Sequence, residues 1–211
     1  MQNLAGILTE TAARVPDNTV LKLDDTRITY ALLDAMSAKV AGVLRDRGIA
    51  PGERVALIMP NIPQMAFVYY GVLRYGAVVV PMNPLLKARE VAYHLSDSGS
   101  RLVFAWEGIL AEALGGAEEA GGIPVIPVDS GAFMQLLAET DPAPELAEVD
   151  GEDVAVILYT SGTTGRPKGV MYTHRGAYLN SLGEVHHQGF SQDSVYLWTL
   201  PMFHCNGWCT T

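Results

Sequence analysis

The chain has 211 residues, of which 49% are hydrophobic, and it carries a formal net charge of −9. This length suits a single large domain with a hydrophobic core, and the acidic balance excludes the basic surface that a nucleic-acid-binding protein needs. The most apolar region, 67–82, contains an arginine and two glycines and is too short for an integral membrane segment, while two cysteines and no secretory leader predict a cytoplasmic protein.

The first fifty residues predict a short helix, a hairpin and a longer helix. Residues 3–14 have an amphipathic pattern that ends before Pro16. Residues 19–30 alternate apolar and polar side chains around two aspartates, which is typical of a small β-hairpin. Apolar residues then recur at helical spacing as far as Gly48, the expected C-terminal cap: Leu33, Met36, Val40 and Val43.

From residue 55 onward, short apolar runs alternate with helical patterns. We expect Asn61 to cap a helix that has Pro63 in its first turn and ends at Gly76. Strands are expected at 55–59, 77–81, 102–105, 124–128 and 154–159, with further helices at 90–97 and 107–121. This rhythm predicts an α/β fold with a doubly wound, mostly parallel sheet and flanking helices, which binds ligands outside the carboxyl ends of its strands.

An acidic connector interrupts this rhythm at about 139–153. Seven of its fifteen residues are Asp or Glu, two are Pro and none is basic. Such a composition favours a solvated segment that joins two parts of the fold.

The strand at 154–159 runs directly into a segment, 160–170, that suits phosphate binding. It holds four hydroxyl side chains, three glycines, one arginine and one lysine. Glycines let backbone N–H groups approach phosphate oxygens, hydroxyls donate further hydrogen bonds, and Lys168 supplies a positive charge. The composition alone would also fit an ordinary turn. Thr173 is expected to cap a helix over 174–187 with Tyr178, Leu182 and Val185 on one face.

Two other phosphate-binding loops are excluded by spacing. A Walker A loop counted from Gly162 would need glycine at 167 and Ser or Thr at 169, where this chain has Pro and Gly. The spacing of Gly162, Gly165 and Gly169 also differs from the dinucleotide-binding pattern. The chain is therefore neither a P-loop nucleotidase nor a dinucleotide-binding protein of that type.

The string from 159 to 170, Tyr-Thr-Ser-Gly-Thr-Thr-Gly-Arg-Pro-Lys-Gly-Val, resembles the signature of the adenylate-forming (AMP-binding) superfamily, and every position fits. Its members are acyl-CoA synthetases, adenylation domains of peptide synthetases and beetle luciferases. Three other stretches, 27–30, 52–56 and 75–84, look like landmarks of the same family. The resemblance marks residues 1–211 as an incomplete N-terminal part of the adenylate-forming fold, without its remaining strands and its C-terminal lid domain.

The resemblance implies a two-step reaction in which a carboxylic acid is activated by ATP and then transferred to a thiol, usually coenzyme A. Mg²⁺ would accompany ATP, and the family's ligand for this ion lies outside this chain. In such an enzyme the β- and γ-phosphates of ATP would be held by Thr160, Ser161, Gly162, Thr163, Thr164, Gly165 and Lys168.

The stretch 200–208 resembles the acyl-pocket motif of the same family. His204 matches a residue that lies near the substrate carboxylate, and we assign it a catalytic and substrate-binding role on that resemblance. Trp208 matches a residue that gates the fatty-acyl tunnel of bacterial long-chain members. The resemblance favours medium- or long-chain fatty acids, while aryl acids and sulfur-containing short acids remain open. From the residues alone, a packed Trp and a hydrogen-bonded His at a strand end would also fit.

Other histidines and cysteines give weaker signals. His204, Cys205 and Cys209 supply three of the four ligands that a structural zinc site needs, so no metal site is predicted. His186 and His187 lie near a helix end, where a solvated histidine is expected. For His174 we expect a local role at the start of its helix.

The leading interpretation is a fatty-acid–CoA ligase that uses a small carboxylic acid, ATP and coenzyme A, with this chain alone inactive. One alternative is an adenylation domain that loads an amino or aryl acid onto a carrier protein. Another is a truncated, non-catalytic chain that binds nucleotide. A sheet without its later strands is expected to expose apolar surface and an unpaired edge. The sequence leaves open whether the chain forms a homo-oligomer.

Overall fold

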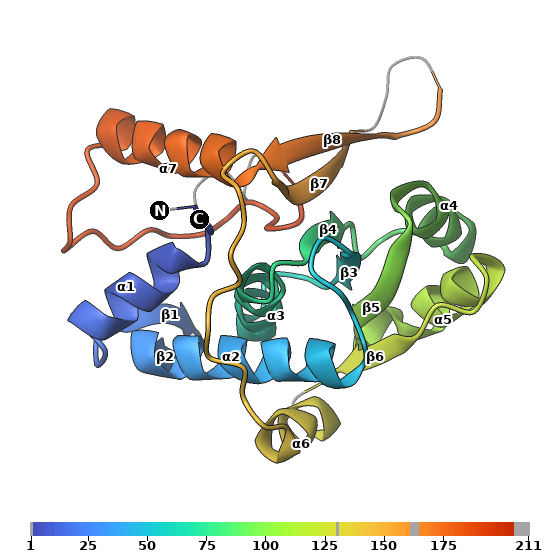
Figure 1. Ribbon diagram of the computed structural model, residues 1–211, viewed down its shortest axis with the longest axis horizontal. Coiled ribbons are helices and arrows are strands. Elements are labelled where there is room, and N and C mark those ends of the chain that lie inside the picture. The colour runs from blue at the N-terminus through green and yellow to red at the C-terminus, as the bar shows by residue number, and fades with distance from the viewer. Residues whose placement is uncertain (1, 130, 161–164, 205–211) are drawn as a thin grey trace.

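The computed structural model describes residues 2–129, 131–160 and 165–204 (Figure 1). The described strands are β1 (Thr19–Leu23), β2 (Thr26–Thr29), β3 (Arg54–Ile58), β4 (Val78–Met82), β5 (Ser100–Trp106), β6 (Val125–Val128), β7 (Val154–Thr160) and β8 (Lys168–Thr173). The described helices are α1 (Gly6–Arg14), α2 (Tyr30–Asp46), α3 (Pro63–Arg74), α4 (Ala88–Ser98), α5 (Leu110–Glu119), α6 (Ala132–Glu139) and α7 (His174–Gln188).

One sheet in the order β6-β5-β3-β4-β7-β8 organises this part of the chain, and β1 and β2 form a separate hairpin. Strands β3 to β7 pair in parallel, whereas β8 runs antiparallel to β7. The carboxyl ends of β3, β4 and β7 therefore lie at one edge of the sheet. The expected α/β fold with a mostly parallel sheet and a small N-terminal hairpin is confirmed.

Each face of the sheet carries its own core. Val55 and Leu57 of β3 pack with α2 and α3, while Ala56 and Ile58 pack with α4 and α5. This division follows from the alternation of side chains along a strand. Figure 1 shows α2 and α3 on one side of the sheet and α4 and α5 on the other, as a doubly wound fold requires.

Three local expectations were wrong or incomplete. Asn61 does not cap α3: the helix begins at Pro63 after Ile62, without a side-chain cap, because the Asn61 amide is bonded elsewhere. Residues 168–170 are not loop but the start of β8, since they pair with 158–160. Helix α6, at 132–139, was not predicted. Gly76 follows α3 as expected, with a φ of +78°.

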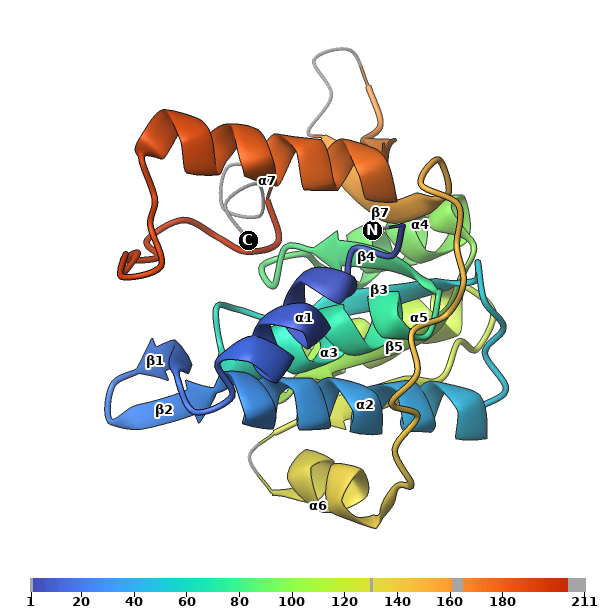
Figure 2. The same ribbon diagram turned by 60° about the vertical axis from the view of Figure 1, so that its left-hand side comes forward.

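The acidic connector after α6 runs across α2 (Figure 2) and is hydrogen-bonded to α2 and to the end of α3. The backbone N–H of Ala143 donates to Ala38 of α2, and that of Ala147 donates to Arg74 of α3, both at 2.9 Å. Its acidic side chains are exposed. The charges are thus solvated as their composition suggests, while the backbone is fixed.

Arg74 joins three segments of the chain. Its guanidinium is buried and donates to Asp34 and Ser37 of α2 and to the backbone oxygen of Pro144 in the connector. A buried cation is tolerated only when its N–H groups find such partners. Arg74 therefore fixes the connector against α2 and α3.

The N-terminal segment is held by α7. Thr173 caps this helix as expected, accepting from the N–H of Gly176 at 3.1 Å. His174 is buried and accepts a 3.0 Å hydrogen bond at Nδ1 from the backbone N–H of Leu4. The expected local role of His174 is therefore wrong, because the start of α7 faces α1. On the predicted apolar face of α7, Tyr178 packs against the core but Leu182 and Val185 are exposed.

Candidate functional site

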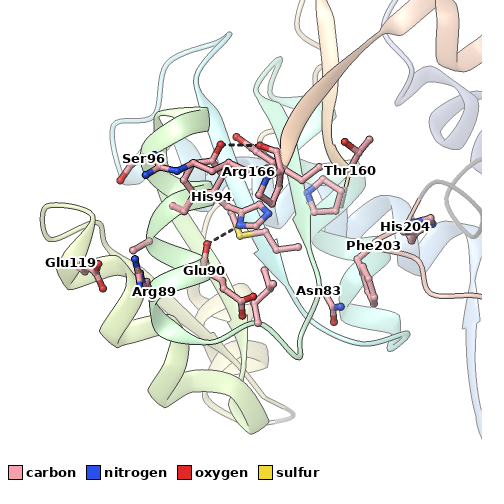
Figure 3. Close-up of a pocket in the computed structure, with 17 residues that line it drawn as sticks. Asn83, Arg89, Glu90, His94, Ser96, Glu119, Thr160, Arg166, Phe203 and His204 are labelled. Atoms are coloured by element: carbon pink, nitrogen blue, oxygen red, sulfur yellow. Dashed lines mark hydrogen bonds between the residues drawn. The ribbon is translucent and has the colours of Figure 1, made fainter. Parts of the chain in front are cut away.

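A cavity of about 880 Å³ lies at the carboxyl ends of β4 and β7. Met82 and Asn83 reach it from the end of β4, and Tyr159 and Thr160 reach it from the end of β7. Helix α4 forms one wall. In Figure 3, Arg89 and Glu119 lie at one side of this cavity, and Phe203 and His204 lie at the other. This is the edge of the sheet where doubly wound folds bind their ligands.

The predicted phosphate-binding residues gather at the end of the β7–β8 pair. Thr160 and Lys168 are direct partners across the two strands, and the Thr160 hydroxyl lies 3.5 Å from the backbone oxygen of Lys168. Both side chains are exposed. Gly165 has a φ of +149°, which favours glycine. The rest of the predicted set, Ser161, Gly162, Thr163 and Thr164, lies outside the described residues.

Two cationic side chains lie at this point although the chain as a whole is acidic. Arg166 and Lys168 lie on the segment that leads into β8, and Arg166 lines the cavity with Thr160 and Pro167. Lys168 is the first residue of β8 and pairs with Thr160, the last residue of β7. A cation pair at the end of a strand can attract a small anion even on a protein of net negative charge.

Helix α4 contacts the segment that leads into β8 and the end of β7 through Tyr93 and Asp97, two residues that the sequence analysis did not single out. The Tyr93 hydroxyl donates to the backbone oxygen of Pro167 at 2.8 Å, and the Arg166 guanidinium lies 5.6 Å from the centre of the Tyr93 ring. One turn later, Asp97 accepts a 2.7 Å hydrogen bond from the Tyr159 hydroxyl. The available signal was the spacing of Tyr93 and Asp97, which places both on one helix face.

Two groups beside this contact have well-defined protonation preferences. Burial raises the pKa of Tyr159, and its hydrogen bond to Asp97 raises that pKa further, so the hydroxyl keeps its proton. His94 is buried with Nδ1 2.7 Å from the backbone oxygen of Glu90. Because a carbonyl only accepts, Nδ1 carries the proton. The His94 ring lies 4.3 Å from the Tyr159 ring. Both side chains are therefore fixed parts of the cavity wall.

His204 lies on the same cavity as Thr160, so the structure brings together the two predicted ends of the site (Figure 3). Its side chain is exposed, and its backbone N–H donates to Pro201 at 3.1 Å to form a turn. Trp208, Cys205 and Cys209 lie outside the described residues.

The described ranges contain no group of three or more His, Cys, Asp or Glu side chains that could hold a metal ion. His186 and His187 are exposed at the end of α7. Within the same ranges, no helix has the length and hydropathy needed to cross a membrane.

Comparison with known proteins places these features in a family. The family model described as "AMP-binding enzyme" matches residues 8–211. The long-chain-fatty-acid–CoA ligase FadD13 of Mycobacterium tuberculosis is 35% identical over 208 residues, which are 97% of this chain and 41% of that protein. The chain thus spans about two-fifths of the length of this curated relative.

Solved structures agree. The N-terminal domain of FACL13 from M. tuberculosis superposes with a TM-score of 0.85 at 35% identity, covering 100% of this chain and 54% of that one. A benzoate CoA ligase from Burkholderia xenovorans LB400 has a TM-score of 0.86 at 26% identity, covering 96% of this chain and 41% of that one. With its sheet, its β7–β8 signature and its relatives among acid–thiol ligases, the chain belongs to the AMP-binding enzyme family.

Proposed function

We propose that this chain forms the phosphate- and acid-binding part of an enzyme that activates a carboxylic acid with ATP and transfers the acyl group to coenzyme A. One observation carries the proposal. Thr160, the last residue of β7, is the cross-strand partner of Lys168, the first residue of β8, and the cavity that Thr160 lines is also lined by His204. A phosphate-binding group and a group suited to a carboxylate therefore share one cavity.

On the nucleotide side, the loop would bind the β- and γ-phosphates of ATP. The Thr160 hydroxyl would donate to a phosphate oxygen, and Lys168 would supply a compact positive charge. Ser161, Gly162, Thr163, Thr164 and Gly165 belong to the same proposed set through the signature of the family. A loop of this kind needs glycines because backbone N–H groups must approach phosphate oxygens closely.

On the acid side, His204 would lie beside the substrate carboxylate, and Trp208 would contact the acyl chain. A medium- or long-chain fatty acid is the proposed substrate, supported by the acyl-pocket resemblance at 200–208 and by the FadD13 relative, which is named for long-chain fatty acids. The benzoate CoA ligase among the structural neighbours makes an aryl acid the competing choice. An adenylation domain that loads an aryl or amino acid onto a carrier protein is the corresponding alternative.

The proposed reaction has two displacements. A carboxylate oxygen attacks the α-phosphorus of ATP, an acyl–phosphate bond forms, and pyrophosphate leaves. The coenzyme A thiol then gives up its proton to solvent and its sulfur attacks the acyl carbon; the bond from that carbon to the phosphate oxygen breaks, and AMP leaves with the electron pair. Both steps depend on positioning and on stabilising charge at phosphate. The described residues do not fit a metal site of their own, so no step is assigned to a metal ion held by this chain.

Equilibrium binding to the purified chain tests the nucleotide half. Wild type, Lys168→Ala and Lys22→Ala would be titrated with a fluorescent ATP analogue, with unlabelled ATP as competitor. Lys22 is exposed on the β1–β2 hairpin, so its replacement removes the same charge far from the cavity. Lys168→Ala is expected to weaken ATP binding by about tenfold or more, because a charge-assisted hydrogen bond to phosphate is lost. Equal affinities for the two variants would refute the assignment.

The same proteins would be tested for carboxylate-dependent exchange of pyrophosphate into ATP. Fatty acids of graded length and benzoate would serve as substrates. The chain alone is expected to show no exchange; exchange that follows one length class and falls in Lys168→Ala would identify the acid and contradict the expected inactivity. Exchange with benzoate alone would replace the fatty acid by an aryl acid.

A further inference from the structure

Asn61 links the carboxyl edge of the sheet to the segment that carries His204. It follows β3 by three residues, at the carboxyl edge where β4 and β7 also end. Its side chain is partly buried and does not cap α3, although its position just before Pro63 is typical of a cap. The amide is therefore available for another task.

Both ends of the Asn61 amide bond one short stretch of backbone. Its Nδ2 donates to the oxygen of Leu200 at 2.7 Å, and its Oδ1 accepts from the N–H of Met202 at 2.8 Å. The sequence separations are 139 and 141 residues. A side-chain amide can satisfy a neighbouring N–H and C=O at once, in the way that a paired strand does.

The consequence for His204 follows from the next bond along the chain. Pro201 lies between the two residues that Asn61 holds, and its backbone oxygen accepts from the N–H of His204 at 3.1 Å. Met202 adds an apolar contact, since it packs against the core that α3 shares. A chain of hydrogen bonds therefore connects the edge of the sheet to His204: Asn61 bonds the backbone of Leu200 and Met202, and Pro201 between them bonds the N–H of His204.

We propose that Asn61 is a positioning residue for acid binding: by clamping Leu200 and Met202 it fixes the turn that presents His204 to the cavity. This inference rests on the proposed function, because it takes the His204 end of the cavity as the place of the carboxylate. Its two side-chain hydrogen bonds join Asn61 to Leu200 and Met202, so a change at Asn61 should act on the His204 end of the cavity more than on the Thr160 end.

Three variants test the clamp. Asn61→Ala removes both bonds. Asn61→Asp keeps the size and the acceptor for Met202 but turns an oxygen toward the Leu200 carbonyl, so one bond is lost. Ser194→Ala is the matched control. It lies in the segment between α7 and His204, and it removes a local 2.8 Å hydrogen bond that the Ser194 hydroxyl accepts from the N–H of Ser191.

The first measurement is amide hydrogen exchange in the peptide 198–204. Asn61→Ala is expected to accelerate exchange there by about tenfold, because the Met202 N–H loses its acceptor and opens locally. Ser194→Ala should leave that peptide as in wild type. Unchanged exchange in Asn61→Ala would show that the clamp does not hold the segment and would overturn the proposal.

The second measurement compares affinities for a C10 or C14 fatty acid and for ATP, each titrated separately. Asn61→Ala and Asn61→Asp are expected to weaken acid binding by roughly tenfold, since small displacements of a binding group have large effects, and to change ATP binding by less than about twofold. Equal losses for both ligands would reduce Asn61 to a structural residue. A wild-type chain that binds neither ligand would instead remove the proposed function, and the inference with it.

Discussion

The Tyr93 hydroxyl, on α4, donates a 2.8 Å hydrogen bond to the backbone oxygen of Pro167, the residue before Lys168. This bond joins residues 74 positions apart in the sequence and holds the backbone immediately before β8. The ring also lies beneath Arg166. Helix α4 therefore holds Pro167, which belongs to the segment that we propose binds phosphate, and preorganisation of a binding segment contributes directly to ligand affinity.

Replacing Tyr93 by Phe keeps the ring under Arg166 and removes only the hydrogen bond. ATP affinity is expected to fall by up to about tenfold, which corresponds to the net value of one hydrogen bond. Titration with the fluorescent ATP analogue measures the change. Tyr75→Phe is the matched control, because it removes a 2.8 Å bond from a tyrosine hydroxyl to the backbone oxygen of Ile49, away from the cavity. Equal ATP affinity in Tyr93→Phe and Tyr75→Phe would show that the hydrogen bond from Tyr93 to Pro167 does not support ATP binding.

Protonation of His174 should weaken the fold in acid. Burial lowers the pKa of His174 below its ordinary value of 6.5, and the charge of Asp153 opposes this shift only in part. The unfolded chain then binds more protons between the two pKa values. The free energy of unfolding therefore falls as the pH drops from about 6.5 through the folded-state pKa, by at most about 1.4 kcal/mol per pH unit.

His174→Gln is the test of that pH dependence. Glutamine can accept from the Leu4 N–H but does not titrate. Urea unfolding at several pH values should show a shallower dependence in the variant than in wild type, with the other histidines present in both. Parallel curves would show that His174 is not the responsible group.

Arg74 should matter more to stability than a surface arginine. Arg74→Met leaves Asp34 and the Pro144 oxygen without their guanidinium partner, and we expect a loss of roughly 2–4 kcal/mol. The value lies below that of a fully buried pair because the Asp34 side chain is 33% exposed. Arg45→Met breaks the exposed pair with Asp46 and a 3.1 Å hydrogen bond to the Asp141 backbone oxygen, and it should cost much less because exposed ion pairs contribute little to stability. Urea unfolding compares the two, and similar losses would argue against the special role of Arg74.

Two glycines in helices should respond in opposite directions to alanine. A Cβ at Gly42 of α2 would lie 2.1 Å from the backbone oxygen of Asp141, so Gly42→Ala must displace the connector and destabilise the fold by about 1–3 kcal/mol. A Cβ at Gly183 of α7 would meet no atom of the described residues within 4 Å beyond its own helix backbone and chain neighbours, and Gly183→Ala should stabilise by about 0.5–1 kcal/mol. Thermal melting of both variants checks the signs.

Local pattern was sufficient for the parts of the fold that bury continuous apolar runs. Strands β3 to β7 and the helices between β3 and β6 were predicted because their side chains are sorted onto two faces of one sheet. Strand β8 was missed because its first residues, from Lys168, belong to a glycine-rich signature and become a strand only through pairing with β7. Helix α6 was not predicted, although its two buried residues, Phe133 and Leu137, have helical spacing.

Residue types alone were enough to propose a phosphate-binding role for Thr160 and Lys168, and that role stays a prediction. The site was not predictable where distant segments meet. Asn61 looked like a helix cap because its bonding partners, 139 and 141 residues away, leave no local trace. Tyr93 and His174 were likewise placed by contacts that only the folded chain creates.

The hydrogen bond between Leu4 and His174 has a consequence for the order of events during biosynthesis. The two residues are 170 positions apart. A ribosome that adds 5–20 residues per second needs roughly 10 to 30 seconds between them. Throughout that time α1 has been made but lacks the α7 partner that holds its start. Until then the segment before α1 has only its earlier contacts, such as the 3.0 Å hydrogen bond from Asn3 Nδ2 to the Leu73 oxygen, and its contact with His174 forms last.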